Sequence, residues 1–226
     1  PQQYEYIRQD YPQLYQMIQR RVQEGRWEPG GGMWVECDCN ITGGEYMIRQ
    51  FLWGQRFTRK YFGYTANAFW LPDTFGYSFA IPQIMKGCGV DYFLTTKMTW
   101  NDTNTFPYTS FYWQGLDGTQ VLTHMNRTHI GPSPDTLIDL CLDGHENRDP
   151  IREKISSNMR LFSYGKGDGG GGPEFEMIEM SRRVADLEGV PRSGHTTVGR
   201  FMDQLRDSIR KPTVYADELY LELHRG

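Results

Sequence analysis

The chain has 226 residues, with 24 lysines and arginines against 28 aspartates and glutamates, a net charge of -4 and a pI of about 5.8. This balance predicts no basic face for nucleic acid, and no apolar run reaches the length of a membrane-spanning helix. A composition with 38% hydrophobic and 14% aromatic residues excludes a disordered chain. We therefore expect a folded protein with neither a nucleic-acid nor a membrane partner.

The cysteines form no CxxC pair and have no histidine pair of zinc-finger type after them. Cys37 and Cys39 flank Asp38, and in a strand they would point to opposite sides, so a mutual disulfide is not expected. We interpret all four cysteines as free, mostly buried thiols, at positions 37, 39, 88 and 141.

The first third of the chain predicts two helices and two strands. Apolar residues at helical spacing over residues 1–25 indicate one amphipathic helix, and residues 33–36 read as a strand. A long helix is expected from Gly43 and Gly44 to about Phe62, where Gly63 ends it. The apolar run 68–71 predicts a buried strand that stops at Pro72.

The remainder continues the alternation. Strands are expected at 91–95, 109–113, 120–123, 161–164, 196–198 and 218–223, and helices at 78–88, 137–142, 173–187 and 199–209. The pair Asp117-Gly118 predicts a hairpin between strands 109–113 and 120–123. Alternating strands and helices predict an α/β fold with a parallel sheet, either closed as a barrel or open. No internal repeat or linker divides the chain.

Asp73 stands where the buried strand at 69–71 ends, among the aromatic residues Trp70, Phe75 and Tyr77. A carboxylate in a loop after a strand is placed as catalytic groups are in α/β enzymes. An aspartate in a Pro-Asp-Thr-Phe-Gly segment is also a common turn residue that bonds its own backbone. Local spacing leaves both interpretations open.

Seven segments carry a recognisable pattern, in chain order WVECDCN at 34–40, RQFLWGQRF at 49–57, FWLPDTFGYS at 69–78, WNDTNTFP at 100–107, GLDGTQVLTHM at 115–125, GKGDGGGGP at 165–173 and ELYLELHRG at 218–226. In sequence and spacing they resemble the class II α-mannosidases, the retaining, zinc-dependent glycoside hydrolases of family 38. The resemblance is strongest to the cytosolic and fungal vacuolar branch. It covers nearly the whole chain, which makes it far more specific than any single motif.

The resemblance implies a distorted seven-stranded β/α barrel of the glycoside hydrolase/deacetylase type. Residues 1–226 would be part of its N-terminal catalytic domain and would lack the first strand. It implies a retaining α-mannosidase that hydrolyses terminal α-linked mannose from mannose-containing oligosaccharides, in the cytoplasm or in a vacuole or lysosome. A barrel without its first strand exposes an edge and apolar surface, so association into homo-oligomers is also expected.

Two carboxylates carry the chemistry that the resemblance implies. Asp73 is identified as the nucleophile, which forms a covalent mannosyl intermediate, and Asp168 in the glycine-rich loop is the candidate acid that protonates the leaving oxygen. Substrate-binding roles are expected for Glu36, Asp38, Phe75, Lys97, Trp100, Asn101 and Asp102. For each of these residues, solvation, a polar loop or core packing is the structural alternative.

The resemblance also implies a Zn²⁺ ion for which Asp73 is one ligand. In the family the other ligands come from a His-x-Asp pair and from a later His-Asp motif, and this chain contains neither. The isolated chain is therefore expected to bind zinc weakly or not at all and to be inactive.

Two competing functions remain open. The chain could be a non-catalytic carbohydrate-binding or assembly fragment, which would bind sugar without metal. A metal-dependent deacetylase on a related barrel would need a histidine-rich ligand set, and the sequence shows none.

Overall fold

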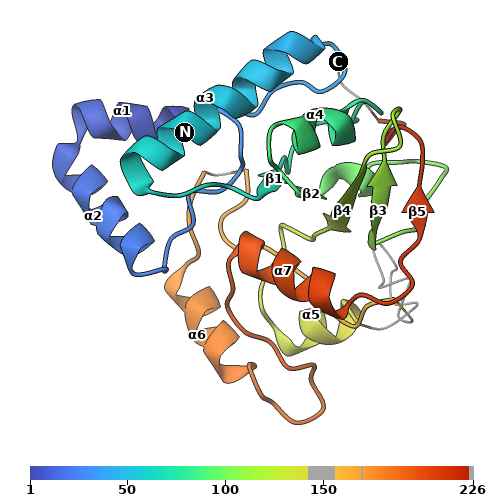
Figure 1. Ribbon diagram of the computed structural model, residues 1–226. Coiled ribbons are helices and arrows are strands. Elements are labelled where there is room, and N and C mark those ends of the chain that lie inside the picture. Colours follow the sequence, from blue (N-terminus) through green and yellow to red (C-terminus); the bar gives the residue numbers. More distant parts are fainter. Residues whose placement is uncertain (142–155, 169, 224–226) are drawn as a thin grey trace.

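The computed structural model describes residues 1–141, 156–168 and 170–223, and its centre is a sheet whose five strands have the order β1-β2-β4-β3-β5 (Figure 1). The strands are β1 (Ala68–Trp70), β2 (Tyr92–Thr95), β3 (Ser110–Gln114), β4 (Gln120–Met125) and β5 (Val214–Tyr215). Strands β1, β2 and β4 are mutually parallel, β3 is antiparallel to β4, and β5 is parallel to β3.

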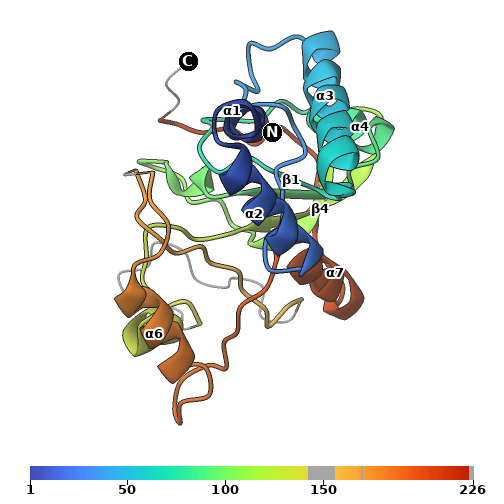
Figure 2. The same ribbon diagram turned by 90° about the vertical axis from the view of Figure 1, so that its left-hand side faces the viewer.

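The helices are α1 (Gln2–Asp10), α2 (Pro12–Gln23), α3 (Gly44–Phe62), α4 (Ile81–Gly87), α5 (Pro134–Asp139), α6 (Phe175–Arg183) and α7 (Val198–Ser208), with a 3₁₀ turn at Lys97–Thr99. Helices α4 and α7 lie on opposite faces of the sheet (Figures 1 and 2). No helix in the described ranges is both long and apolar enough to cross a membrane.

Strand pleating explains the two apolar layers. Successive side chains point to opposite faces, so Phe69 and Phe93 join the layer that also contains Phe51 of α3. Their sequence neighbours Ala68, Tyr92 and Leu94 join the layer formed with α7. Because both faces of β1 and β2 are covered, these strands are nearly continuous apolar runs.

Phe93 is at the centre of the larger layer and is fully buried. Its ring centroid lies 5.5 Å from that of Phe69, 5.0 Å from that of Tyr77 and 5.1 Å from that of Trp113. Burying one such ring stabilises the fold by roughly 1.5–3 kcal/mol. The layer holds β1 and β2 in place, and both strands lead into the loops described below.

The single helix predicted over residues 1–25 is wrong, because the structure has two helices there. Helix α1 ends at Asp10, Tyr11 has φ -134° and ψ 63°, and Pro12 is the first residue of α2. Proline disfavours helical geometry in the residue before it and lacks a backbone donor, so the helix breaks at this position.

The strand predicted at 33–36 is also absent. The N–H of Trp34 donates to the carbonyl of Gln50, and the N–H of Val35 donates to the side chain of Gln50, at 2.9 and 3.0 Å. The segment therefore packs on α3 instead of in the sheet. Gly54 allows this approach, because a Cβ at this position would lie only 2.5 Å from the carbonyl carbon of Met33.

Three further strand predictions need correction. Residues 161–164 and 218–223 make single bridges, Phe162 with Arg127 and Leu219 with Tyr77. Residues 196–198 form a helix cap instead, in which Thr197 accepts the N–H of Arg200. The strand at the β3 side of the sheet is instead β5, which was not predicted from the sequence.

Most other elements are confirmed within a few residues, including α3 with its left-handed end at Gly63 and the β3–β4 hairpin. Helix α4 begins at Ile81, three residues later than predicted, and the helix predicted at 173–187 is limited to α6. The α/β class is confirmed. The described residues form a five-stranded sheet, and the seven-stranded barrel stays a prediction.

Candidate functional site

The loops that follow β1, β2 and β4 meet at one edge of the sheet, because parallel strands end on the same side. Thr96, just after β2, donates its hydroxyl to the carbonyl of Pro72 at 2.5 Å. After β4, the N–H of Asn126 donates to the carbonyl of Thr95 at 3.1 Å. These bonds fix the loop that carries Asp73 beside the loop that carries Lys97.

Asp73 and Lys97 form an ion pair at this edge, with 2.5 Å between Asp73 Oδ1 and Lys97 Nζ. The side chain of Asp73 is 61% exposed, whereas that of Lys97 is only 10% exposed. The ammonium lies 4.7 Å from the ring centroid of Phe75 and 4.2 Å from that of Trp100. Lys97 is thus held by one carboxylate and two aromatic faces.

Glu36 reaches the same loop from the segment before α3. Its Oε1 accepts the backbone N–H of Asp73 at 2.9 Å. Loss of hydration raises the pKa of Glu36, and the negative charge of Asp73 adds to the rise, while the Asp73 N–H and Lys97 oppose it. The site therefore has two neighbouring carboxyl groups, and one cation faces Asp73.

Asp38 shapes the neighbouring loop. Its Oδ1 accepts the N–H groups of Asn40 and Ile41, each at 2.8 Å, and Asn40 donates its amide to the carbonyl of Phe75 at 3.1 Å. Gly76 has φ 109°, and a Cβ there would lie 2.9 Å from the amide nitrogen of Asn40. In the described contacts Asp38 therefore supports Phe75 through Asn40.

The loop after Lys97 is tied to the last described residues. Asn101 Oδ1 accepts the N–H of Glu222 at 2.7 Å, and its amide donates to the carbonyl of Met98. The Glu222 carboxylate accepts the N–H groups of Thr103 and Asn104 at 2.7 and 2.9 Å, and the bond from Thr103 contributes most to lowering the pKa of Glu222. Both polar atoms of the Asn101 side chain are thus engaged within the protein.

Asp168 lies in the loop that follows the segment paired with Arg127. Its side chain is 91% exposed, its φ is 54°, and its Oδ1 is 3.9 Å from Nε2 of His129. Ser163 donates its N–H to Arg127 at 2.7 Å in a parallel bridge that continues β4. The loop that carries Asp168 therefore begins near the same edge of the sheet as the loops after β1, β2 and β4.

The structure brings together five of the sequence-predicted site residues: Glu36, Asp73, Phe75, Lys97 and Trp100. No contact described here joins Asp38, Asp102 or Asp168 to Asp73. Sequence reasoning missed Asn40, Thr96, Gly76 and Glu222, which hold the loops. Only Gly76 has a local signal, since a glycine inside an aromatic turn favours positive φ.

The residues present do not form a complete metal site. In the described ranges there is no group of three or more His, Cys, Asp or Glu side chains that could hold a metal ion. All four cysteines are free, as predicted, but the prediction that most are buried is wrong, because only Cys39 is fully buried. Asp73 alone among the predicted zinc ligands is on this chain, and its Oδ1 faces Lys97.

The pattern of the family described as "Glycosyl hydrolases family 38 N-terminal domain" matches residues 1–218. Alpha-mannosidase G of Dictyostelium discoideum and Alpha-mannosidase 2C1 of Homo sapiens are each 41% identical over 225 residues, which is 100% of this chain and 20% and 21% of theirs. Alpha-mannosidase of Saccharomyces cerevisiae is 40% identical, again over 100% of this chain and 21% of its own length. The chain thus spans about a fifth of these relatives.

Solved structures share the fold. An alpha-mannosidase from Enterococcus faecalis V583 superposes with a TM-score of 0.70 at 17% identity, covering 95% of this chain and 24% of that protein. A 4-alpha-glucanotransferase from Thermococcus litoralis superposes with a TM-score of 0.57 at 15% identity, covering 93% and 31%. At such low identity the likeness concerns the fold alone.

Proposed function

The chain belongs to glycoside hydrolase family 38, and from that premise we propose that residues 1–226 are part of the catalytic domain of a retaining α-mannosidase. Its substrates are mannose-containing oligosaccharides, from which it removes terminal α-linked mannose. The observation that supports this most is the ion pair of Asp73 and Lys97 at the end of β1, with Glu36 on the same loop.

The proposed reaction uses Asp73 as the nucleophile. Its carboxylate forms a bond to the anomeric carbon while the glycosidic C–O bond breaks, and Asp168 gives its proton to the leaving oxygen. In the second half, the Asp168 carboxylate takes a proton from water as that water attacks the same carbon and the bond from this carbon to the Asp73 oxygen breaks. Mannose leaves with its original anomeric configuration, and both aspartates return to their starting states.

The surrounding residues hold this group in place. Lys97 and the N–H bond to Glu36 fix the direction of the Asp73 loop, and the outer faces of Phe75 and Trp100 suit the apolar face of a sugar ring. Asp38, Asn101 and Asp102 belong to the same proposed substrate region.

Zinc belongs to the proposal as a cofactor of the complete protein, where it would polarise sugar hydroxyls. Asp73 would supply one ligand, and the remaining ligands are not among the residues of this chain. Since the residues present do not make a metal site by themselves, no step here is assigned to the ion. A location in the cytoplasm or in a vacuole or lysosome, and association into homo-oligomers, are further parts of the proposal.

The test is hydrolysis of an aryl α-mannoside by the complete protein in its natural reading frame. Asp73→Asn should lower kcat by at least about a thousandfold. The control is Asp91→Asn, an exposed carboxylate paired with Lys86 before β2 at the opposite edge of the sheet, and it should leave kcat unchanged. Proton NMR should show α-mannose as the first product; β-mannose, or full activity of Asp73→Asn, would refute the assigned role.

A further inference from the structure

A cavity lies away from the Asp73 site, on the face of the sheet covered by α7. It has a volume of about 840 Å³, within the range of small-molecule sites. Trp70 of β1, residues 158–164 and residues 191–198 line it together with parts of α5, α6 and α7. None of Glu36, Asp73, Lys97 or Asp168 lines this cavity, so the proposed mannosidase chemistry does not use it.

One wall of the cavity is apolar. It is formed by side chains from α5, from α7 and from the segment between residues 159 and 162: Leu137, Leu140, Met159, Leu161, Phe162 and Phe201. A wall of this kind favours an organic body over a bare inorganic ion, because apolar contact gains free energy when water is displaced.

The lining also contains a prearranged polar group. His195 Nε2 is 2.5 Å from the hydroxyl of Tyr164 and 3.2 Å from that of Ser181. Ser181 donates in turn to the carbonyl of Ile178 at 2.7 Å, which anchors the group on α6. Hydroxyls and an imidazole in fixed positions suit a ligand that carries polar groups on its body.

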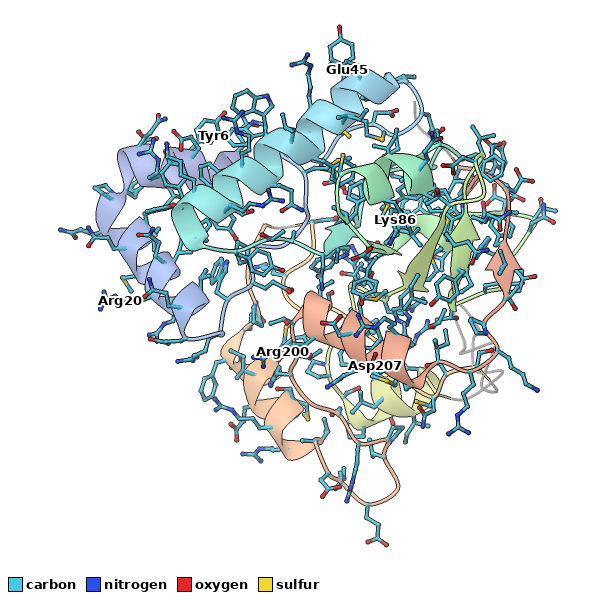
Figure 3. The ribbon with its side chains drawn as sticks, in the orientation of Figure 1. Tyr6, Arg20, Glu45, Lys86, Arg200 and Asp207 are labelled. Carbon is cyan, nitrogen blue, oxygen red and sulfur yellow. The ribbon has the colours of Figure 1, made fainter. Side chains whose placement is uncertain are left out.

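Two of the arginines that line the cavity, Arg26 and Arg200, come from different segments of the chain. Arg200 lies in the first turn of α7, where Figure 3 labels it, and its Nη2 is 3.6 Å from the position that a Cβ at Gly25 would occupy. Arg26 is the next residue after that glycine and also lines the cavity. Two cationic side chains on one cavity favour an anionic ligand.

The charged residues that line the cavity are four arginines, at positions 26, 160, 192 and 200, and one glutamate, Glu28. The oxygens of Glu28, an acidic residue of the cavity lining, accept the N–H groups of Val198 and Gly199 at 2.7 and 3.0 Å. Arg26 reaches Glu24 only at 4.0 Å, and Glu24 is bound more closely by Arg21 at 2.7 Å. Within the described ranges Arg200 has no ion pair. In a chain of net charge -4, this is a local excess of positive charge.

We propose that this cavity binds a small phosphate monoester, with the phosphate at Arg26 and Arg200 and the organic body against the apolar wall. A phosphate monoester carries nearly two negative charges and accepts paired hydrogen bonds from guanidinium groups, which matches two arginines from separate segments of the chain. The site is distinct from the Asp73 site and does not depend on the proposed function.

Calorimetric titration of the 226-residue chain with glucose 6-phosphate, glucose and inorganic phosphate tests the proposal. Glucose 6-phosphate should bind at least about tenfold more tightly than either of the other two, and more weakly as salt is added. Absence of binding would overturn the proposal. Equal affinity for inorganic phosphate would also overturn it, because the apolar wall would then play no part.

Substitutions of the arginines test whether binding takes place in this cavity. Arg26→Gln with Arg200→Gln should weaken glucose 6-phosphate binding at least about tenfold. The matched control is Arg20→Gln on α2, outside the cavity lining, and it should retain the affinity (Figure 3). All three arginines are exposed, so thermal unfolding should confirm folded variants. Asp73→Asn should bind normally; loss of binding there, or equal loss in the control, would contradict the assignment.

Discussion

The two partners of the ion pair, Lys97 and Asp73, differ sharply in their exposure to water. The ammonium of Lys97 is nearly enclosed, whereas the carboxylate of Asp73 has water on most of its surface. Removing the carboxylate therefore strands a cation between two aromatic rings, and removing the cation leaves a solvated anion. The cost of breaking a pair falls on the partner that is buried.

This asymmetry gives a prediction for the isolated chain. Asp73→Asn should lower the free energy of unfolding by about 1–3 kcal/mol, because Lys97 loses its carboxylate. Lys97→Met should cost less, and the double variant should be more stable than Asp73→Asn. Urea denaturation of the four proteins measures the coupling. Independent, additive effects would show that the ion pair does not stabilise the loop.

Glu36 predicts a pH dependence of its own. Its pKa is raised above the usual 4.5, so the folded state holds this proton more strongly than the unfolded state does. The stabilisation is complete below pH 4.5 and is lost as the pH rises through the raised value. Glu36→Gln keeps an oxygen that can accept the Asp73 N–H, and it should be more stable than the natural protein at pH 7.

Urea denaturation at pH 7 and pH 4 measures this effect. The advantage of Glu36→Gln should shrink at the lower pH, where the natural glutamate is also protonated. Glu45→Gln, on the exposed side of α3, is the matched control. A difference that is the same at both pH values would mean that the raised pKa is not its origin.

At the scale of elements, α3 depends on one glycine. A Cβ at Gly54 would lie 2.5 Å from the carbonyl carbon of Met33, 2.7 Å from the carbonyl oxygen of Gly32 and 2.8 Å from that of Met33. These are backbone atoms, which cannot turn aside as a side chain can. Gly54 therefore sets how closely the segment that leads to Glu36 can approach α3.

Gly54→Ala should consequently destabilise the chain by about 2 kcal/mol or more, although alanine favours helix. The comparison is Gly87→Ala at the end of α4, where a Cβ would have nothing within 4 Å. Thermal and urea denaturation should separate the two variants clearly. A neutral Gly54→Ala would show that residues 32–33 can move away from the helix at little cost.

Elements were predictable from the sequence where the signal is local. Helix α3 has a clear apolar period and ends at Gly63 in the left-handed region, and the β3–β4 hairpin has its Asp-Gly turn. The strand prediction for residues 33–36 failed because the N–H groups of Trp34 and Val35 bond to Gln50 of α3. The composition of a segment does not reveal which partner its N–H groups will find. Strand β5 is two residues long, too short for any period to show.

The candidate site, like the elements, was predictable from the sequence only where the signal is local. A carboxylate and a lysine after buried strands could be placed at one edge of a parallel sheet, and the structure pairs them. The residues that hold the loops could not be found in this way. Glu222 is 118 residues from Asn104, and nothing local to either position indicates that they meet.

At the scale of the whole molecule, buried His124 links three parts of the chain. Its Nε2 accepts the N–H of Leu161 at 3.2 Å, so its Nδ1 carries the proton and donates to Ser110 at 2.9 Å. Burial lowers the pKa of His124 well below 6.5, and the charge of Arg160 adds to this. The neutral ring thus joins β4, β3 and the segment before the glycine-rich loop.

The whole chain should therefore lose stability in mild acid. Because the folded pKa lies below 6.5, the stabilisation is present above that pH and is lost as the pH falls, by up to about 1.4 kcal/mol per pH unit. Denaturation at pH 7.5 and pH 5.5 measures this loss. His129→Gln, at an exposed histidine, should show the same loss, whereas a variant in which Gln replaces His124 should show less.

The bridge between Tyr77 and Leu219 has a consequence for biosynthesis. Both N–H groups of this pair donate across it, at 3.0 and 3.1 Å, and Leu223 then bonds to Trp100. The ribosome synthesises the strands that precede Asp73 and Lys97 long before it synthesises Leu219 and Leu223, which bond to the loops after these strands. The loops that carry Asp73 and Lys97 consequently reach their final arrangement only after nearly all of these residues have been translated, however early the sheet forms.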